Sequence, residues 1–340
     1  MIGTGTYGVG IIGYGRVGQR RAQFAHEHPK TEIKVIAEIN STQINDAEKK
    51  YDCKVIKNWK DLIMRPDIQI VTVSVPNGLG AEMATAALRA GKHVLMEKPM
   101  GKNILEAKEL AEVAKKARGR FKVGFNHRYH PAIRKALRLC KEGRIGKIIN
   151  IRARYGHGGR PGYEGEWRGN KELAGGGELT DQGVHVLDLI YAFTGMPSQA
   201  FAWAQTAVWP IQPLEDNGFG LLRFSDGTVA SFHTSWTQWK NLFSFEVFGD
   251  KGSLVIDGLG QSYGPQSLQT AIRRPEMRVL DVETESFEDT EHSWRNEWEE
   301  FMGAVDKGIA FTGSAENGLC VMKMLDALYR SIAEKGAVEI

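Results

Sequence analysis

The first third of the chain alternates short apolar runs with amphipathic stretches. We expect buried strands at 9–12, 33–37, 70–75, 93–96 and 121–125, and helices at 16–28, 43–51, 79–91 and 104–118. Strands separated by helices of this length are typical of βαβ units around a parallel sheet. The apolar, β-branched run at 70–75 fits a strand that is covered on both faces. The pattern therefore predicts a doubly wound parallel sheet of the Rossmann type over residues 1–125.

The pattern changes after about residue 145. An alternating stretch at 148–155 predicts a long strand, and two hairpins are expected at 219–236 and 243–257, each around a Gly-containing turn. A helix that begins near Asp181 is expected to cover one face of the resulting sheet. For 260–291 we expect strands at the end and loops elsewhere, and aromatic residues at 294–301 and apolar residues at 319–328 predict two further helices. Residues 126–340 are therefore predicted to form an α+β domain with a large mixed, mainly antiparallel sheet.

Length, charge and cysteine content narrow the class of protein. At 340 residues the chain is long enough for two domains, and its net charge of +3 comes from scattered side chains rather than from a basic face. We therefore expect no nucleic-acid partner. Three separated cysteines suit a reducing compartment and predict no metal site. Because no apolar run approaches the about 20 residues that span a bilayer and no signal segment is evident, we expect no membrane partner and a cytoplasmic protein.

A glycine-rich turn joins the first predicted strand to the first predicted helix. Its residues follow the pattern GxGxxG: Gly13, Tyr14, Gly15, Arg16, Val17 and Gly18. Glycines at these places permit a tight turn, backbone approach to a pyrophosphate and close packing of helix on strand. Glu38 ends the second strand, where a carboxylate can accept hydrogen bonds from ribose hydroxyls and would repel a 2′-phosphate. The turn predicts NAD as the cofactor and NADP as the less favoured one, unless Glu38 is only a solvated strand end.

Later motifs resemble one enzyme family. Met96-Glu97-Lys98-Pro99 follows a strand of the first domain, and the run from Gly175 to Asp188 has the form GGGxxxDxGxHxxD. Together with GxGxxG, Pro76-Asn77, Gly124-Phe125-Asn126 and Trp167-Arg168, in this order, they resemble the Gfo/Idh/MocA family of NAD(P)-dependent oxidoreductases. One departure is visible, because Gly80 stands where the family often has histidine in a PNxLH turn. The resemblance implies a dehydrogenase that acts on a CH–OH group of a sugar or polyol.

The resemblance also implies a catalytic set, Lys98, Asp181 and His185. Residue chemistry agrees, because Lys98 follows a parallel strand at the edge where ligands of such sheets bind. Asp181 and His185 are four residues apart and hence share a helical face, and an imidazole can take a hydroxyl proton near neutral pH. Either His185 or Lys98 is the proton-transfer group. Asp188 is expected to support the helix.

The remaining site residues are predicted by placement. By resemblance, Pro76, Asn77, Glu97, Lys98, Trp167 and Arg168 lie near the cofactor. The stretch 152–168 is rich in arginine and aromatic residues, which suit a sugar or sugar derivative, including a nucleotide- or phosphate-linked one, or an inositol. The substrate candidates are Arg128, Tyr155, His157, Arg160, Tyr163 and His233.

Two other functions stay open on the same scaffold. One is NAD-assisted glycoside cleavage through transient oxidation of a ring carbon, and the other is a non-catalytic, NAD-responsive regulator. An intact Lys98, Asp181 and His185 set argues against a regulator. The broad sheet of the second domain predicts a homodimer or homotetramer, because a large uncovered apolar face is unusual on a monomer.

Overall fold

The computed structural model describes residues 6–274, 281–287 and 292–340. Its contacts divide the chain into two compact units. Unit 1 consists of Met1–Phe125 with Trp294–Leu319, and unit 2 consists of Asn126–Ser293 with Cys320–Ile340. The sequence pattern places residues 294–319 in the second domain with the rest of 126–340, whereas the contacts group Trp294–Leu319 with unit 1. The physical reason is that Trp298 and Phe301 pack into the core of unit 1 beside Phe24.

Unit 1 is built on a six-stranded sheet in the order β3-β2-β1-β4-β5-β6, in which every neighbouring pair is parallel. Its strands are β1 (Tyr7–Ile12), β2 (Thr31–Ala37), β3 (Lys54–Ile56), β4 (Ile70–Val73), β5 (His93–Glu97) and β6 (Phe121–Gly124). The strand order changes direction between β1 and β4, which is where doubly wound sheets bind their ligands. The expected Rossmann-type sheet is confirmed.

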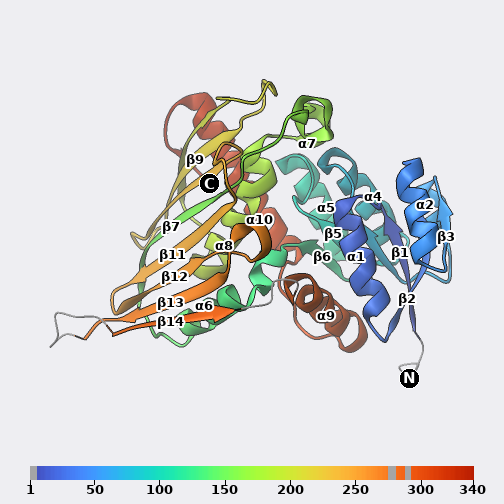
Figure 1. Ribbon diagram of the computed structural model, residues 1–340, viewed down its shortest axis with the longest axis horizontal. Helices are drawn as coiled ribbons and strands as arrows, with labels where there is room; N and C mark the ends of the chain where they lie inside the picture. Colours follow the sequence, from blue (N-terminus) through green and yellow to red (C-terminus); the bar gives the residue numbers. More distant parts are fainter. Residues whose placement is uncertain (1–5, 275–280, 288–291) are drawn as a thin grey trace. The chain divides into compact units, whose positions relative to one another are not determined.

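Helices pack on both faces of this sheet (Figure 1). They are α1 (Arg16–Glu27), α2 (Ser41–Lys50), α3 (Trp59–Ile63), α4 (Asn77–Arg89), α5 (Ile104–Lys116) and α9 (His292–Lys307). Helix α9 returns from far along the chain to pack with α1, burying Trp298, Phe301 and Met302 against Phe24. This return completes one face of unit 1.

Unit 2 is built on a nine-stranded sheet in the order β14-β13-β12-β11-β7-β10-β9-β8-β15. Its strands are β7 (Ile148–Gly156), β8 (Gln199–Gln205), β9 (Asn217–Arg223), β10 (Val229–Ser235), β11 (Leu242–Gly249), β12 (Gly252–Asp257), β13 (Gln266–Ile272), β14 (Asp281–Phe287) and β15 (Val338–Glu339). Within this nine-stranded sheet, β7 and β10 are the only parallel neighbours among the described strands. The expected mixed, mainly antiparallel sheet is therefore confirmed.

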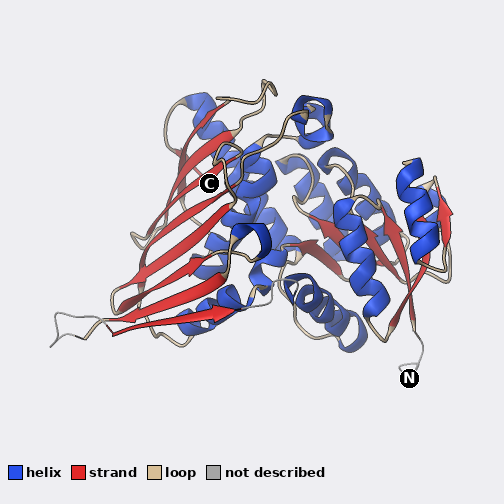
Figure 2. Cartoon of the chain, viewed as in Figure 1, coloured by secondary structure: helices blue, strands red, loops and turns tan. Residues whose placement is uncertain are grey.

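The two faces of this sheet differ. One face of the sheet is covered by helices (Figure 2). These helices are α6 (Pro131–Lys141), α8 (Val184–Thr194) and α10 (Ala315–Glu334). Along β7 the side chains alternate, so that Ala153 and Tyr155 are buried on the helix side whereas Arg152 and Arg154 are exposed on the other. The exposed face, which we call the outer face, carries Trp203, Phe219, Leu221, Arg152, Arg154, Glu246 and His233.

Some elements were not expected from the sequence. Strand β3, helix α3 and strand β8 were missed because each is short or lacks a clear apolar period. Strand β13 falls where loops were expected between 260 and 291, because its Gln, Ser and Thr side chains hide a strand that pairs fully with β12. Strand β14 bears out the strand expected near the end of that segment, whose residues 275–280 and 288–291 lie outside the described ones.

Candidate functional site

The glycine turn of unit 1 is shaped for a phosphate group. Gly13 adopts a φ of +83°, and a Cβ at Gly18 would overlap the carbonyl oxygen of Gly13, so neither place accepts another side chain without strain. Gly15 starts α1 without a side-chain cap, and a Cβ there would meet nothing within 4 Å. The first amides of α1 are thus accessible to an anion, and no acidic side chain lies in that first turn.

The other three residues of the turn have different surroundings. The side chain of Tyr14 is buried in the core, where its hydroxyl donates to Asp46 at 3.1 Å, so only its backbone belongs to the turn. Burial raises the pKa of Tyr14 far above its ordinary value. Arg16 is exposed and Val17 is half-buried on α1. Of these three predicted cofactor residues, Arg16 is therefore the one with a solvent-accessible side chain.

Glu38 joins two loops at the carboxyl edge of the sheet. Its Oε2 accepts from the backbone N–H of Tyr14 at 2.6 Å, and its Oε1 accepts from those of Ile39 and Asn40 at 2.7 and 2.9 Å. A carboxylate offers about four lone-pair sites, so three bonds leave acceptor capacity for a hydroxyl. Glu38 therefore fixes the shape of the glycine turn and still keeps a negative charge beside it.

The segments predicted to serve the cofactor meet at one edge of unit 1. Strands β2, β1, β4 and β5 are neighbours and parallel, so Glu38, Gly13, Pro76 and Lys98 follow strand ends that lie side by side. Pro76 caps α4, and Asn77 is its buried first residue. Lys98 is half-buried, and its peptide bond to Pro99 is cis.

Glu97, which precedes Lys98, is held inside unit 1. Its Oε1 accepts from Nε and Nη2 of the buried Arg21 at 2.7 and 2.5 Å. The Nη1 of Arg21 donates to Glu297 of α9 at 2.5 Å. Burial alone would lower the pKa of Arg21. The two carboxylates raise this pKa by more than burial lowers it, so the pKa of Arg21 lies above its ordinary value. Glu97 thus anchors the end of β5 to α1. This ion pair with Arg21 explains the carboxylate without any contact to a cofactor.

In unit 2, a single turn of π-helix, η4 (Leu179–Gly183), leads into α8. The predicted pair Asp181 and His185 therefore lies across a junction of π- and α-helix rather than within one regular helix, a distortion that is frequent at functional sites. The buried Glu215 anchors the start of the turn, because its Oε1 accepts from the N–H groups of Gly177 and Leu179 at 3.1 and 3.0 Å. Burial raises the pKa of Glu215 although these hydrogen bonds oppose the rise.

His185 lies in a buried cluster on the helix side of β7. Its ring stacks on that of His127, with ring centroids 3.8 Å apart and planes inclined by 21°. The Nε2 of His127 lies 3.1 Å from the hydroxyl of Tyr155, whose ring is 5.5 Å from that of Tyr263. Burial raises the pKa of Tyr155 well above its ordinary value, so this phenol remains protonated.

Asp181 has a cationic partner. Its Oδ2 accepts from Nε of Arg168 at 3.0 Å, and the Arg168 guanidinium lies 4.4 Å above the ring of Trp167. The Asp181 carboxylate raises the pKa of Arg168. The structure thus brings together three of the predicted residues, Trp167, Arg168 and Asp181, in one contact chain within unit 2.

The substrate candidates fall into separate places. Tyr155 belongs to the cluster around His185. His157 and Tyr163 join an aromatic group with Trp236, the ring of Tyr163 lying 4.9 Å from that of Trp236. Arg160 is half-exposed and binds Glu166 through two hydrogen bonds of 2.8 and 2.7 Å. Tyr155 is therefore the candidate with a direct relation to His185.

Two substrate candidates are placed elsewhere. Arg128 forms a buried pair with Asp188, in which two guanidinium nitrogens donate to the two carboxylate oxygens at 2.7 and 2.6 Å. This pair ties residues 126–129 to α8, which is the supporting role expected of Asp188. His233 lies on the outer face, where its ring stacks on Phe219 at 4.1 Å, because β10 places residue 233 opposite Arg154 and Phe219. Arg128 is thus held in a buried ion pair, and His233 lies on the outer face.

Two family models cover most of the chain. Residues 7–125 match the model of the oxidoreductase family with an NAD-binding Rossmann fold, and residues 133–255 match the GFO/IDH/MocA C-terminal domain. The chain belongs to the Gfo/Idh/MocA family. Levoglucosan dehydrogenase of Pseudarthrobacter phenanthrenivorans is 30% identical over 73% of this chain and 73% of the relative. The family resemblance drawn from the motifs is confirmed, and the protein is an NAD-binding oxidoreductase.

Other members of the Gfo/Idh/MocA family cover nearly the whole chain. D-glucoside 3-dehydrogenase of Escherichia coli (strain K12) is 27% identical over 98% of this chain and 97% of its own length. A solved structure of levoglucosan dehydrogenase in complex with NADH and levoglucosan superposes with a TM-score of 0.89, at 26% identity, over 98% of this chain and 99% of the other. These relatives share both units with this chain.

Within this Gfo/Idh/MocA member, the sequence did not point to His127, Tyr263 or Arg21. His127 directly follows Gly124-Phe125-Asn126, a motif that was used only as part of the family resemblance. The available signal was a run of polar residues, 126–128, directly after an apolar strand. Tyr263 lies in the segment expected to be mainly loop, and Arg21 lies on the helix expected at 16–28, for which no buried charged residue was predicted.

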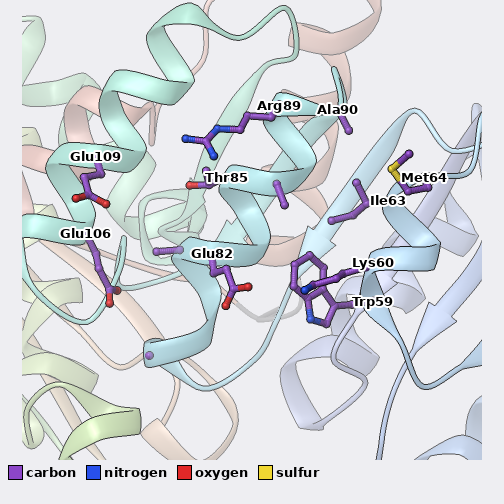
Figure 3. A pocket seen from close by; sticks show the side chains of 13 residues that line it. Trp59, Lys60, Ile63, Met64, Glu82, Thr85, Arg89, Ala90, Glu106 and Glu109 are labelled. Carbon is purple, nitrogen blue, oxygen red and sulfur yellow. The ribbon is translucent and has the colours of Figure 1, made fainter.

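A cavity of about 890 Å³ lies elsewhere in unit 1, along α3, α4 and α5 (Figure 3). Trp59, Ile63 and Met64 line one side of it, and Glu82 and Arg89 of α4 line another. It contains none of the predicted site residues.

Among the described residues, no helix combines the length and apolar character that crossing a membrane requires. The same part of the chain holds no cluster of three or more histidine, cysteine or acidic residues suited to a metal ion.

Proposed function

We propose that this oxidoreductase oxidises a secondary hydroxyl of a neutral sugar or polyol, or reduces the matching ketone. The observation that carries the proposal is the buried imidazole of His185 in a cluster of hydrogen-bonding aromatic residues. An alcohol dehydrogenase needs a group that removes the hydroxyl proton, and an imidazole is suited to this near neutral pH. NAD, when bound, accepts or supplies the hydride.

The proposed roles of the chain's own residues follow from their chemistry. His185 takes the hydroxyl proton, and Lys98 donates a hydrogen bond to the reacting oxygen. Asp181 holds a negative charge near His185 while Arg168 fixes its carboxylate. In unit 1, the first amides of α1 bind the pyrophosphate, and Pro76 and Asn77 lie at the sheet edge that would face the nicotinamide half.

A neutral substrate is favoured by the pairing of the arginines. Arg128, Arg160 and Arg168 are each bound to a carboxylate, of Asp188, Glu166 and Asp181 respectively. A phosphate group would have to compete with these carboxylates, whereas sugar hydroxyls can bind beside them. Trp167 is half-buried at the edge of the core formed by Tyr163 and Trp236, and its ring is a planar surface of the kind that suits the CH face of a sugar ring. We therefore favour a neutral sugar or inositol over a phosphate-linked one.

The test is a coupled screen with the purified protein. Neutral sugars, inositols and sugar phosphates are offered with NAD or NADP, and formation of reduced cofactor is measured by absorbance. We expect turnover with a neutral compound and with NAD. Turnover only with sugar phosphates would reject the neutral substrate. Cleavage of chromogenic glycosides without net reduction of NAD would favour the glycosidase alternative, and NAD binding without any turnover would favour a regulator.

We further propose that the protein works as a homodimer or homotetramer through the outer face. Trp203, Phe219 and Leu221 expose 65%, 40% and 46% of their surface on adjacent strands. The neighbouring Arg152 and Glu246 form an ion pair at 2.5 Å, so a second copy could offer the complementary charges. Analytical ultracentrifugation should show a dimer or tetramer that Leu221→Asp dissociates. A wild-type monomer at micromolar concentration would reject this proposal.

The free cysteines bear on the compartment in which we propose that the protein works. All three cysteines, Cys53, Cys140 and Cys320, are free thiols, and burial raises the pKa of Cys53 to about 11 and that of Cys140 to about 12. Free thiols suit the reducing cytoplasm that we propose as the working compartment.

A further inference from the structure

We propose that His127 is a positioning residue for His185, and that the two stacked imidazoles bind one proton between them, which the hydrogen bonds of His127 direct to His185. The proposal rests on the proposed function only in that His185 is taken to move the hydroxyl proton. It adds a residue that neither the motifs nor the family match points out.

The stacking fixes the plane of His185. The two ring centroids are 3.8 Å apart and the planes are nearly parallel, with an inclination of 21°. Both side chains are buried, His127 directly after β6 and His185 in the first turn of α8. A ring in face-to-face contact cannot tilt without losing that contact. The direction in which His185 presents its nitrogen atoms is therefore set in part by His127.

The hydrogen bonds of His127 match a neutral imidazole. Asn126 Nδ2 donates to the hydroxyl of Ser293 at 3.3 Å, which leaves Asn126 Oδ1 facing His127 Nδ1 at 3.2 Å. Since Oδ1 can only accept, Nδ1 carries the proton of the neutral ring. Nε2 then accepts from the hydroxyl of Tyr155 at 3.1 Å. Both nitrogens of the neutral ring are satisfied, and a second proton would require the Tyr155 hydroxyl to change from donor to acceptor toward Nε2.

The surrounding groups favour one positive charge and oppose two. The cluster is faced by Asp181 of η4, by Glu178 just before it, and by the phenols of Tyr155 and Tyr263, whose pKa values burial raises. The ring of His130 lies 5.6 Å from that of His127, and burial lowers its pKa to about 4, so it stays neutral. Farther along α8, Asp188 is already paired with Arg128.

Two imidazolium ions at this ring distance repel each other strongly. Even at the dielectric constant of water, like charges so close shift the second pKa by about one unit, and burial enlarges the shift. Titrations coupled to this extent belong to the pair. Because protonation of His127 would force its hydrogen bond with Tyr155 to reverse direction, we place the first proton on His185.

The direct test is an NMR titration of isotope-labelled histidine in the wild-type protein between about pH 8 and pH 5. His127→Gln and His185→Gln assign the two rings. We expect the pKa of His127 to rise by at least about one unit when His185 is replaced, because the repelling charge is gone. Equal pKa values of each ring in the presence and absence of the other would overturn the proposal.

A kinetic series separates positioning from general damage. His127→Gln removes the aromatic face and should lower kcat about tenfold, move the acid limb of the pH profile and leave the KM for NAD unchanged. His127→Phe keeps a planar face and should recover part of kcat. The matched control is His130→Gln, a buried histidine that touches His127 edge-on and binds Gln266. An equal kcat loss and limb shift in the control would overturn the proposal.

The outcomes also distinguish this proposal from the proposed function. If His185→Gln retained full turnover, the proton-transfer role of His185 would fail while the coupled titration could still be observed. If the two rings titrated independently in a protein whose turnover depends on His185, the proposed function would stand and the role of His127 would fail.

Discussion

The two units hold their functional groups in different ways. In unit 1 the phosphate-binding turn consists of consecutive residues, 13–18, and offers backbone amides at the start of α1. In unit 2 the cluster around His185 consists of side chains from η1 (Asn126–Tyr129), β7, α8 and η5 (Gln261–Tyr263). The first site is local in sequence and depends on the absence of side chains. The second depends on long-range packing and on the identity of each side chain.

This difference predicts different responses to substitution. A change at Gly15, where a Cβ meets nothing within 4 Å, should affect cofactor affinity and little else, because this residue contributes only backbone groups. A change in the cluster of unit 2 should affect the chemical step while leaving cofactor affinity intact. The following predictions test that separation.

The largest effect is expected at His185. His185→Asn removes the proposed proton acceptor and should lower kcat by about 10²–10⁴-fold, the range typical of general acid–base groups, with NAD affinity unchanged. Steady-state kinetics and calorimetric titration with NAD measure the two quantities. The matched control is His233→Asn on the outer face, which should leave kcat nearly unchanged. A comparable loss of kcat in His233→Asn would indicate that His233 takes part in substrate binding or turnover.

A second large effect concerns the pH dependence of stability. Burial lowers the pKa of His130 from 6.5 to about 4. The unfolded chain therefore binds this proton at higher pH than the folded one, so stability that is complete above pH 6.5 is lost as the pH falls toward 4. A shift of this size corresponds to about 3 kcal/mol. Urea unfolding at several pH values should show a flatter profile for His130→Gln, and parallel profiles would refute the assignment.

In unit 1, Gly15→Asp should weaken NAD binding by about 100-fold, because it places a carboxylate where the amides of α1 face the pyrophosphate. Gly15→Ala is the control, since a Cβ there meets nothing within 4 Å and the fold should be kept. Thermal melting checks folding, and calorimetry measures affinity. Unaltered affinity in Gly15→Asp would show that the cofactor lies elsewhere.

The smallest effect is expected at Glu38. Glu38→Gln keeps an acceptor oxygen but removes the charge, and should shift the ratio of NAD to NADP affinity toward NADP by about tenfold, the value of one hydrogen bond to a charged group. Because Glu38 also binds three backbone amides, Gln is preferable to Ala. Equal losses for both cofactors would reject Glu38 as the group that discriminates between them.

The same contrast explains how much the sequence could predict. The sheet of unit 1, its glycine turn and Glu38 follow from apolar periodicity and from residues close together in the chain. Asp181 and His185 were predicted as site residues mainly through resemblance to a family, because a DxxxH pair on a helix is common. His127 was missed because its stacking on His185 depends on how α8 packs beside residues 126–129, and β13 was missed because backbone pairing rather than apolar side chains defines it.

The return of α9 to unit 1 has a consequence for how the protein is made. Domains generally fold from the N-terminus as the chain leaves the ribosome. Here Arg21 can form its buried ion pair with Glu297 only after nearly nine-tenths of the chain has been synthesised. The same holds for the packing of Phe301 on Phe24. The apolar surface around Phe24 can therefore be fully covered only after all of residues 126–293 have been synthesised.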